Sequence, residues 1–522
     1  MRAIERKVSS PDHGSLVVAF FVLLAACVTW YTWHSGTSGF LFDDAMYLLM
    51  ADFFSPYVQT NPYVQAFVMQ ESRFPPGLPL LIAFLGGGSQ NMGVAHLVIA
   101  GTFVASAVAY FLWMRHASVS LPMALGAVCV FCLLPGTLSL VLDVWSEYLY
   151  LAFVFTALYL AERARQGYGR TPELLLASAF CIGLSILTRT VGIALLGAFV
   201  LFLSPLRANR KLLYMLVAIL PYGVWQLIKV INGYHGSYIE DMAPYATWSG
   251  LASLVTSEIP QRIPLIWNAW NVNLNVNDGS AAPLAALSGL LLGLAVVGLV
   301  QRLTRQGIDA YYAVGYIGLI VAWPYPDHMT RFVYPLVPFG IFYALVGSTW
   351  MMSFLTTLRT VPRHGAAAFV LAGSLVLIVP NALSVGQRFL TPLPEPVPED
   401  FRHTRYWLRG DLAATKWEIE RRSRVIALLN RIRSRIPEDQ CVYATHSPFV
   451  MLHTQRVSVL YSKQFSWDDL QKCRYYLVMN LGTRDFPPMY PAEQLSRLGA
   501  KPVDVIRDSR GLVNGILLER AS

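Results

Sequence analysis

The sequence predicts an α-helical polytopic membrane protein with about 11 transmembrane helices, followed by a small C-terminal α/β domain on the outer face. Of its 522 residues, 55% are hydrophobic and only 14% are charged, whereas a soluble globular protein carries roughly 25% charged residues. Long apolar runs recur up to about residue 386, and the composition changes after residue 387. We therefore expect a transmembrane domain at 1–386 and an extracytoplasmic α/β domain at 387–522.

The apolar runs define the expected membrane spans, because a spanning helix needs about 20 apolar residues. The first run is 16–33, directly after a basic N-terminus. An outer loop at 34–75 follows, and Pro75-Pro76 begins a rigid corner at which the chain returns into the membrane, since proline fixes φ and cannot continue a helix. The other expected spans are 92–114, 119–140, 147–162, 173–188, 190–204, 212–231, 283–300, 308–324, 332–354 and 366–386.

The basic residues of the loops support this order of spans. Short cytoplasmic loops are enriched in Lys and Arg, and the loops assigned inside contain Arg115, Arg163, Arg165, Arg170, Arg207, Arg210, Lys211, Arg302, Arg305, Arg359 and Arg363. The outer loops and helix ends contain only Arg73, Arg189, Lys229, Arg262 and Arg331. This asymmetry predicts a multi-pass protein of the inner (plasma) membrane with a cytoplasmic N-terminus. It also accounts for the net charge of +9 without a nucleic-acid partner.

Two later segments have local patterns of their own. From Asn268 to Asn277 asparagine alternates with apolar residues, which predicts a strand-like stretch, either an interfacial segment or a sugar-contacting edge. Four prolines at 392–398 predict an extended linker. Beyond it we expect a small α/β domain, with helices or helical turns at 421–436, 468–471 and 492–498 and strands at 441–444, 457–461, 473–479, 502–507 and 512–519.

Cys441 and Cys473 each begin a predicted strand. If these strands are neighbours, the two thiols come within the separation that a disulfide requires. An outer compartment permits oxidation. The pair is therefore a candidate disulfide.

Charged residues at the outer helix ends are the candidate site, because charge at membrane depth is costly and usually functional. An enzyme that uses a sugar linked to a lipid phosphate needs a carboxylate base for the acceptor hydroxyl. It also needs fixed cations for the departing phosphate. Both kinds of group are present: the acids Asp43, Asp44, Asp143 and Glu147, and the single arginines Arg73, Arg189 and Arg331.

Five short motifs over residues 16–386 carry a family resemblance. They are Phe42-Asp43-Asp44-Ala-Met-Tyr47, Arg73-Phe-Pro75-Pro76-Gly-Leu-Pro-Leu, Ser146-Glu147, Leu187-Thr-Arg189-Thr-Val-Gly192 and Arg331-Phe-Val-Tyr334-Pro335-Leu-Val-Pro338. In this order they resemble motifs of the GT-C membrane glycosyltransferases, which include the protein O-mannosyltransferases and the lipid A aminoarabinose transferases. The resemblance implies a polyprenyl-phosphate sugar donor and inversion at the anomeric carbon.

The resemblance also implies roles for individual residues. Asp43 matches the family's catalytic aspartate, but Asp44 replaces the usual glutamate and Thr190 the usual proline, so either Asp43 or Asp44 is the base. The remaining candidates fall into two groups. Those for binding substrate or lipid phosphate are Arg73, Glu147, Arg189, Asp327, His328 and Arg331, and the supporting residues are Tyr47 and Asp143.

The expected function is a hexosyl- or pentosyltransferase of cell-envelope glycosylation. Its partners are a polyprenyl-phosphate-linked sugar, membrane lipid and an acceptor on the outer face, which is a glycan, a lipid or a protein. No cofactor is assigned. A divalent cation at the acid pair occurs in some relatives and suits carboxylates, but the sequence has too few ligands to assign a metal.

Structural explanations compete with these roles. Asp43 and Asp44 alternatively cap a helix N-terminus, and Arg331 alternatively snorkels to the interface. Tyr47 either packs or orients the carboxylate four residues earlier.

Two further candidates also have alternatives. Asp143 and Glu147 alternatively form a structural ion pair with Arg189. His328 is a surface residue or a phosphate contact rather than a metal ligand.

Two alternative functions differ in class or donor. A lipid-linked oligosaccharide ligase or polymerase uses a diphosphate donor, which favours more clustered arginines than this chain has. A transporter or flippase often shows internal repeats and charges at mid-membrane depth. Here we find no repeat, and the acids lie at outer helix ends.

Overall fold

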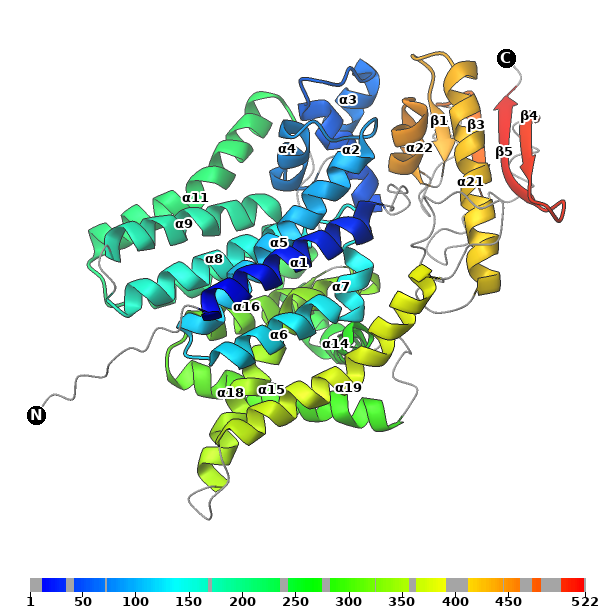
Figure 1. The fold of residues 1–522 in the computed structure, drawn as a ribbon. Helices are drawn as coiled ribbons and strands as arrows, with labels where there is room; N and C mark the ends of the chain where they lie inside the picture. The colour runs from blue at the N-terminus through cyan, green and yellow to red at the C-terminus, as the bar shows by residue number, and fades with distance from the viewer. Residues whose placement is uncertain are drawn as a thin grey trace, which may run out of the picture.

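The protein is described from a computed structural model, in which a helical bundle carries a small sheet at one end (Figure 1). The described residues are 12–33, 42–70, 73–167, 171–234, 243–274, 282–323, 325–355, 363–390, 412–444, 446–460, 472–479 and 499–520. The expected linker prolines, the helical turn at 468–471 and the helix at 492–498 lie outside these ranges.

Helices occupy all the apolar runs that the sequence marks as spans. They are α1 (Asp12–Trp33), α5 (Met92–His116), α6 (Leu121–Leu133) with α7 (Pro135–Leu140), α8 (Glu147–Arg165), α9 (Thr171–Thr188), α10 (Ile193–Phe202), α11 (Ala208–Ile231), α15 (Ala282–Thr304), α16 (Ile308–Ala322), α18 (Val337–Leu355) and α19 (Arg363–Leu390). Within the described ranges, six helical stretches are long and apolar enough to cross a membrane. The chain is a multi-pass membrane protein, and the count of about 11 spans stays a prediction.

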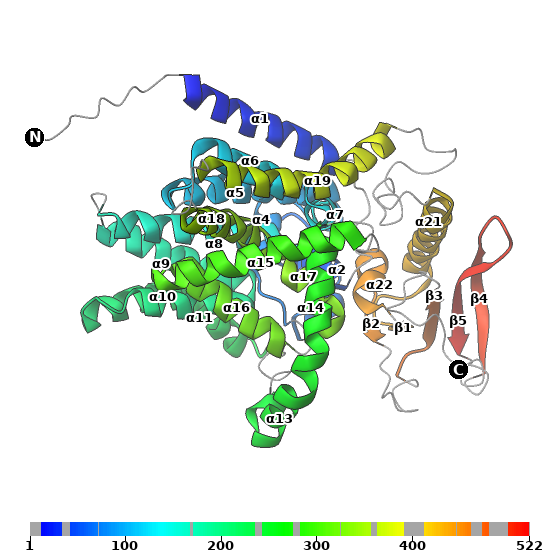
Figure 2. The ribbon, with the colours of Figure 1, turned by 90° about the horizontal axis from the view of Figure 1, so that it is seen from below.

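The centre of the bundle is a chain of packed helices in which α5 lies along α8, α8 along α9 and α9 along α11. Large aromatic side chains fill the space between them, and the rings of Tyr110 and Phe155 lie 4.9 Å apart. By contrast, α1 runs along the edge of the bundle (Figure 2) and exposes Leu16, Val18 and Leu23. An apolar surface of this kind suits contact with lipid.

The expected outer loop at 34–75 is largely helical in its described part. It contains α2 (Phe42–Phe54) and α3 (Pro62–Gln70), and α4 (Gly77–Phe84) begins directly after Pro76. A β-carbon on Gly77 would lie 2.8 Å from the Thr188 hydroxyl oxygen, so only glycine allows α4 to start this close to the end of α9. The Pro-Pro corner therefore brings α4 against the residue that precedes Arg189.

The predicted strand-like stretch from Asn268 is wrong over its described part, because α14 (Ile259–Leu274) is helical through these residues. The side-chain amides of Asn271 and Asn273 each donate to a backbone carbonyl four residues earlier, at 3.1 and 2.8 Å. The alternation of asparagine with apolar residues therefore did not indicate a strand with one polar face. Before α14 lie η2 (Ala243–Ala246), α13 (Trp248–Ser253) and the π-helical turn η3 (Leu254–Glu258).

The C-terminal domain is a five-stranded mixed sheet with strand order β2-β1-β3-β5-β4. Its strands are β1 (Val442–Ala444), β2 (Ser458–Leu460), β3 (Tyr475–Met479), β4 (Ala500–Arg507) and β5 (Val513–Arg520). β1 pairs in parallel with β2 and β3, whereas β5 runs antiparallel to β3 and β4. The helix α21 (Leu412–Arg435) covers one face, where Leu428 and Ile432 join Leu477 and Leu517 in a buried cluster.

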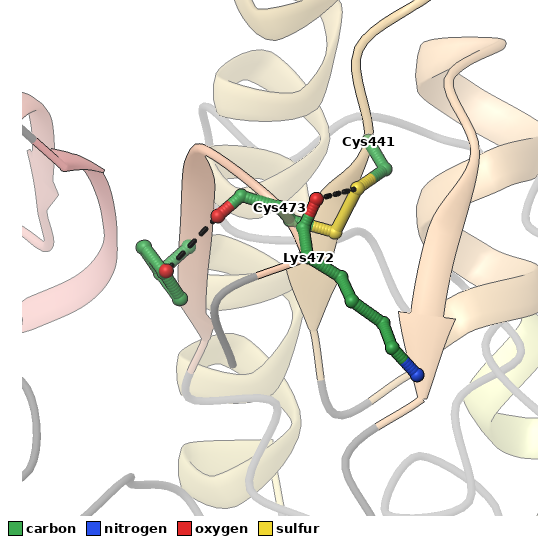
Figure 3. The surroundings of a disulfide bond; sticks show 4 residues. Cys441, Lys472 and Cys473 are labelled. Atoms are coloured by element: carbon green, nitrogen blue, oxygen red, sulfur yellow. Dashed lines mark hydrogen bonds between the residues drawn. A yellow bond between two sulfur atoms is a disulfide. The ribbon is translucent and has the colours of Figure 1, made fainter. Parts of the chain in front are cut away.

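A disulfide joins Cys441 to Cys473 beside this sheet (Figure 3), and the two Cα atoms lie 5.2 Å apart. Cys441 directly precedes β1, and Cys473 lies two residues before β3. The two strands are neighbours, with Val442 opposite Tyr475. The structure therefore provides the strand pairing on which the candidate disulfide depended.

The helix α22 (Ser447–Thr454), which the sequence did not indicate, joins this domain to the bundle by packing on α2. Its residues Met451 and Leu452 are buried in the same apolar cluster as the bundle. The side-chain amide of Asn61 donates to the carbonyl oxygens of Glu438 and Gln455, at 3.2 Å each. The sheet domain is thus attached to the helix that carries Asp43 and Asp44.

Candidate active site

Four charged side chains from distant parts of the chain meet at the end of the bundle that faces α22. Arg331 pairs through Nη1 with Asp43 and through Nε with Glu147. Arg189 pairs with the same Glu147 oxygen, Oε1. We call these four residues the charge cluster, and their formal charges sum to zero.

Each member of the charge cluster lies at the end of a helix. Asp43 is in the first turn of α2, and Glu147 is the first residue of α8. Acids at these positions are favoured by the helix dipole. Arg189 is an extended residue between α9 and η1 (Thr190–Gly192), and Arg331 lies in α17 (Met329–Val333), which continues through η5 (Tyr334–Leu336) into α18.

Burial differs sharply within the charge cluster. The Glu147 side chain is fully buried, and those of Arg189 and Arg331 are 9% and 12% exposed. The Asp43 side chain is 28% exposed. Buried charges require charged partners, so the two arginines and Glu147 hold one another. Asp43 is the more exposed of the two acids in the cluster.

The two adjacent aspartates have different surroundings. Asp43 contacts Arg331, as described above, whereas Asp44 is fully buried. One Asp44 carboxylate oxygen accepts a hydrogen bond from the backbone N–H of Ala45 at 2.7 Å. The structure therefore gives different surroundings to the two candidates between which the sequence left the choice of base open.

Trp145 lies against the charge cluster and was missed by sequence reasoning. The Cζ atom of Arg331 lies 3.7 Å from the centre of the Trp145 ring, within the range of a cation–π contact. The indole N–H donates to Asp143 at 3.3 Å. Asp143 thus contacts the site through Trp145. The position of this aromatic residue two residues before Glu147 was the available signal in the sequence.

The remaining predicted residues are not members of the charge cluster. The Tyr47 hydroxyl shares a hydrogen bond of 2.9 Å with Ser146, which ties α2 to the start of α8. Arg73 is exposed and donates to the Tyr325 hydroxyl at 2.8 Å. His328 is also exposed.

Asp327 belongs to the short helix η4 (Pro326–His328), and its side chain lies outside the described atoms. Among the residues that the structure describes, no group of three or more His, Cys, Asp and Glu side chains could hold a metal ion.

The structure shows some of the contacts expected from the purely structural explanations of these residues, namely ion pairing, snorkelling and helix capping. Glu147 does pair with Arg189, but Arg331 joins the same carboxylate, so the contact is a shared cluster rather than an isolated ion pair. Arg331 is largely buried between two acids and does not extend to an exposed interface. Asp43 occupies the first turn of a helix and also contacts Arg331, so capping alone does not describe it.

Comparisons with known proteins identify the fold. No protein-family model matches the sequence, and no curated protein matches it. The crystal structure of ArnT from Cupriavidus metallidurans bound to undecaprenyl phosphate matches with a TM-score of 0.55 and 12% identity, covering 97% of this chain and 98% of that chain. The apo form of ArnT matches with a TM-score of 0.53 at the same identity and coverage.

A third solved structure, the arabinofuranosyltransferase AftD from Mycobacteria, matches with a TM-score of 0.50 and 13% identity. The match covers 97% of this chain and 40% of that chain. At such identities the similarity concerns the fold. The chain therefore has the GT-C fold, which confirms the expectation from the five motifs.

Proposed function

We propose that this protein is a membrane glycosyltransferase that moves a hexose or pentose from a polyprenyl-phosphate donor to an acceptor on the outer face of the inner membrane. The observation that carries this proposal is the charge cluster, in which Arg331 contacts both Asp43 and Glu147. The cluster combines one accessible carboxylate with two buried guanidinium groups. These are the groups that displacement of a lipid phosphate by a hydroxyl requires.

The proposed reaction is a single displacement. The acceptor hydroxyl attacks the anomeric carbon of the donor sugar while its proton passes to the Asp43 carboxylate. The bond between the anomeric carbon and the lipid-phosphate oxygen breaks, and the electron pair leaves with the phosphate. Attack opposite the leaving group inverts the configuration at the anomeric carbon.

Asp43 is the proposed base because it is the accessible acid beside the arginines, whereas Asp44 is fully buried. A base has to come within hydrogen-bonding distance of the proton that it removes. The contact with Arg331 also fixes the position of the Asp43 carboxylate.

Arg331 and Arg189 are the proposed phosphate-binding residues, with Glu147 holding both in place. A guanidinium carries five N–H donors, and the pairs with Asp43 and Glu147 engage only two nitrogens of Arg331. The other donors suit phosphate oxygens, which arginine binds in a fork. The negative charge that grows on the leaving phosphate would then face two fixed cations.

ArnT, whose fold this chain shares, was solved with undecaprenyl phosphate, which supports a lipid phosphate as the leaving group. We further propose a transmembrane domain at 1–386 and an extracytoplasmic domain at 387–522. The contact of α22 with α2 supports this arrangement, because it places the sheet domain next to the charge cluster, where acceptors would arrive.

The test is sugar transfer by purified protein offered a panel of synthetic polyprenyl-phosphate hexoses and pentoses, with release of polyprenyl phosphate as the readout. Asp43→Asn should slow release by at least about 100-fold, the usual contribution of a general base. Asp44→Asn is the matched control and should retain most of the activity. Full activity of Asp43→Asn would contradict the assignment, and an inactive Asp44→Asn beside an active Asp43→Asn would move the base to Asp44.

A further inference from the structure

The aromatic ring of Trp145 covers one face of the Arg331 guanidinium, with 3.7 Å between Cζ and the ring centre. The two ion pairs of Arg331, with Asp43 and Glu147, use its Nη1 and Nε atoms. The guanidinium is therefore held on one face by an aromatic ring and along its edge by two carboxylates. A planar cation held in this way cannot rotate about its long axis without losing a contact.

The orientation of Trp145 is itself supported. Its indole N–H donates to Asp143 Oδ2 at 3.3 Å, and its backbone N–H donates to the Asp143 carbonyl oxygen at 3.0 Å. Trp145 is only 6% exposed. The turn from Asp143 to Trp145 thus fixes the indole plane two residues before Glu147, which begins α8.

We propose that Trp145 and Asp143 are positioning residues, which hold the Arg331 guanidinium so that its remaining N–H groups face the lipid phosphate of the donor. This inference rests on the proposed function, because it presupposes that Arg331 binds a polyprenyl phosphate. It goes further by naming two residues that act through Arg331 without touching the phosphate.

The proposal makes the planar shape of Arg331 important as well as its charge. Lysine is a flexible point charge and cannot stack or bind in a fork. Arg331→Lys should therefore lose much of its phosphate affinity while Trp145 is present. Once Trp145 is replaced by leucine, the arginine is no longer held flat, so the same Arg331→Lys change should cost less.

The experiment measures binding of undecaprenyl phosphate to the full-length protein in lipid nanodiscs. Trp145→Leu should weaken binding about 10-fold, the scale of a desolvated cation–π contact, and Asp143→Asn should weaken it by a smaller factor. Trp145→Phe keeps an aromatic face and should bind more tightly than Trp145→Leu. Trp113→Phe is the control, because Trp113 is a buried ring of the bundle that packs on Phe155 and Phe342; it should bind as wild type does.

The outcomes separate this inference from the proposed function. If wild-type protein does not bind undecaprenyl phosphate, the proposed function fails. If wild type binds and Trp145→Leu binds equally well, the positioning role is wrong and the proposed function stands.

Two other variants keep the test possible if Trp145→Leu misfolds. If Trp145→Leu does not fold, Trp145→Phe and Asp143→Asn, each with and without Arg331→Lys, supply the test. Strictly additive losses in both pairs would overturn the proposal, and smaller losses in the double variants would support it.

Discussion

At the scale of single residues, the difference between Asp43 and Asp44 comes from helix geometry. Successive residues of an α-helix point about 100° apart, so one aspartate meets Arg331 while its neighbour is buried. The motif located the pair in the sequence but could not choose between them, because the choice depends on which face of α2 meets the bundle. Trp145 was missed because its contact with Arg331 forms only when the bundle brings these two distant residues together.

A third acid of α2, Asp52, has surroundings unlike those of Asp43. It is 1% exposed, and its Oδ1 accepts the backbone N–H of Ser89 at 2.8 Å. Its Oδ2 has no hydrogen-bond partner in the described part of the chain. Burial raises the pKa of the Asp52 carboxyl, and the hydrogen bonds from Ser89 lower it less.

Asp52→Asn should therefore raise the melting temperature at neutral pH. A raised folded-state pKa means that the folded protein prefers the neutral carboxyl, so the wild type loses stability as pH rises from the unfolded-state pKa through the folded-state pKa. Asparagine stays neutral, so its advantage should be present above both pKa values and vanish below them. Melting curves of wild type and Asp52→Asn, recorded between about pH 4 and pH 8, test this prediction. A lower melting temperature of Asp52→Asn than of wild type at neutral pH would contradict it.

At the scale of elements, the helices that coincide with long apolar runs were predictable because span length and composition are local properties. The segment at 268–274 was not, since its asparagines bond back to their own helix. The strands of the C-terminal domain followed from short apolar runs, but their order did not. The disulfide between Cys441 and Cys473 depended on β1 and β3 being neighbours, and the sequence could state only that condition.

The contact between α2 and the C-terminal domain should depend on Asn61. Asn61→Ala removes the two hydrogen bonds to Glu438 and Gln455, each of which contributes about 1 kcal/mol. It also removes the bond that Asn61 Oδ1 accepts from the Tyr63 backbone N–H at 2.9 Å, at the start of α3. Hydrogen–deuterium exchange of α22 should become faster while that of β5 stays unchanged.

Asn232→Ala is the matched control for this contact. The Asn232 side chain is exposed and bonds to a carbonyl of its own helix, so its loss should leave α22 unaffected. Equal exchange of α22 in wild type and Asn61→Ala would show that the junction does not depend on this residue.

At the scale of the whole molecule, the fold brings together residues far apart in the sequence. Asp43 and Arg331 are separated by 288 positions, and Glu147 and Arg331 by 184. The five motifs indicated a shared site only through a family resemblance, because the packing that unites them depends on the entire bundle. The chain shares the fold of ArnT over 97% of its length at only 12% identity, so the arrangement of the helices is similar despite extensive sequence difference.

We propose above that the charge cluster binds the phosphate of a polyprenyl-phosphate donor. The most direct measurement is an experimental structure of the full-length protein in lipid nanodiscs with undecaprenyl phosphate. We predict phosphate oxygens within hydrogen-bonding distance of both the Arg331 and the Arg189 guanidinium groups, beside Asp43. A phosphate bound elsewhere, with the ion pairs of the cluster unchanged, would contradict it.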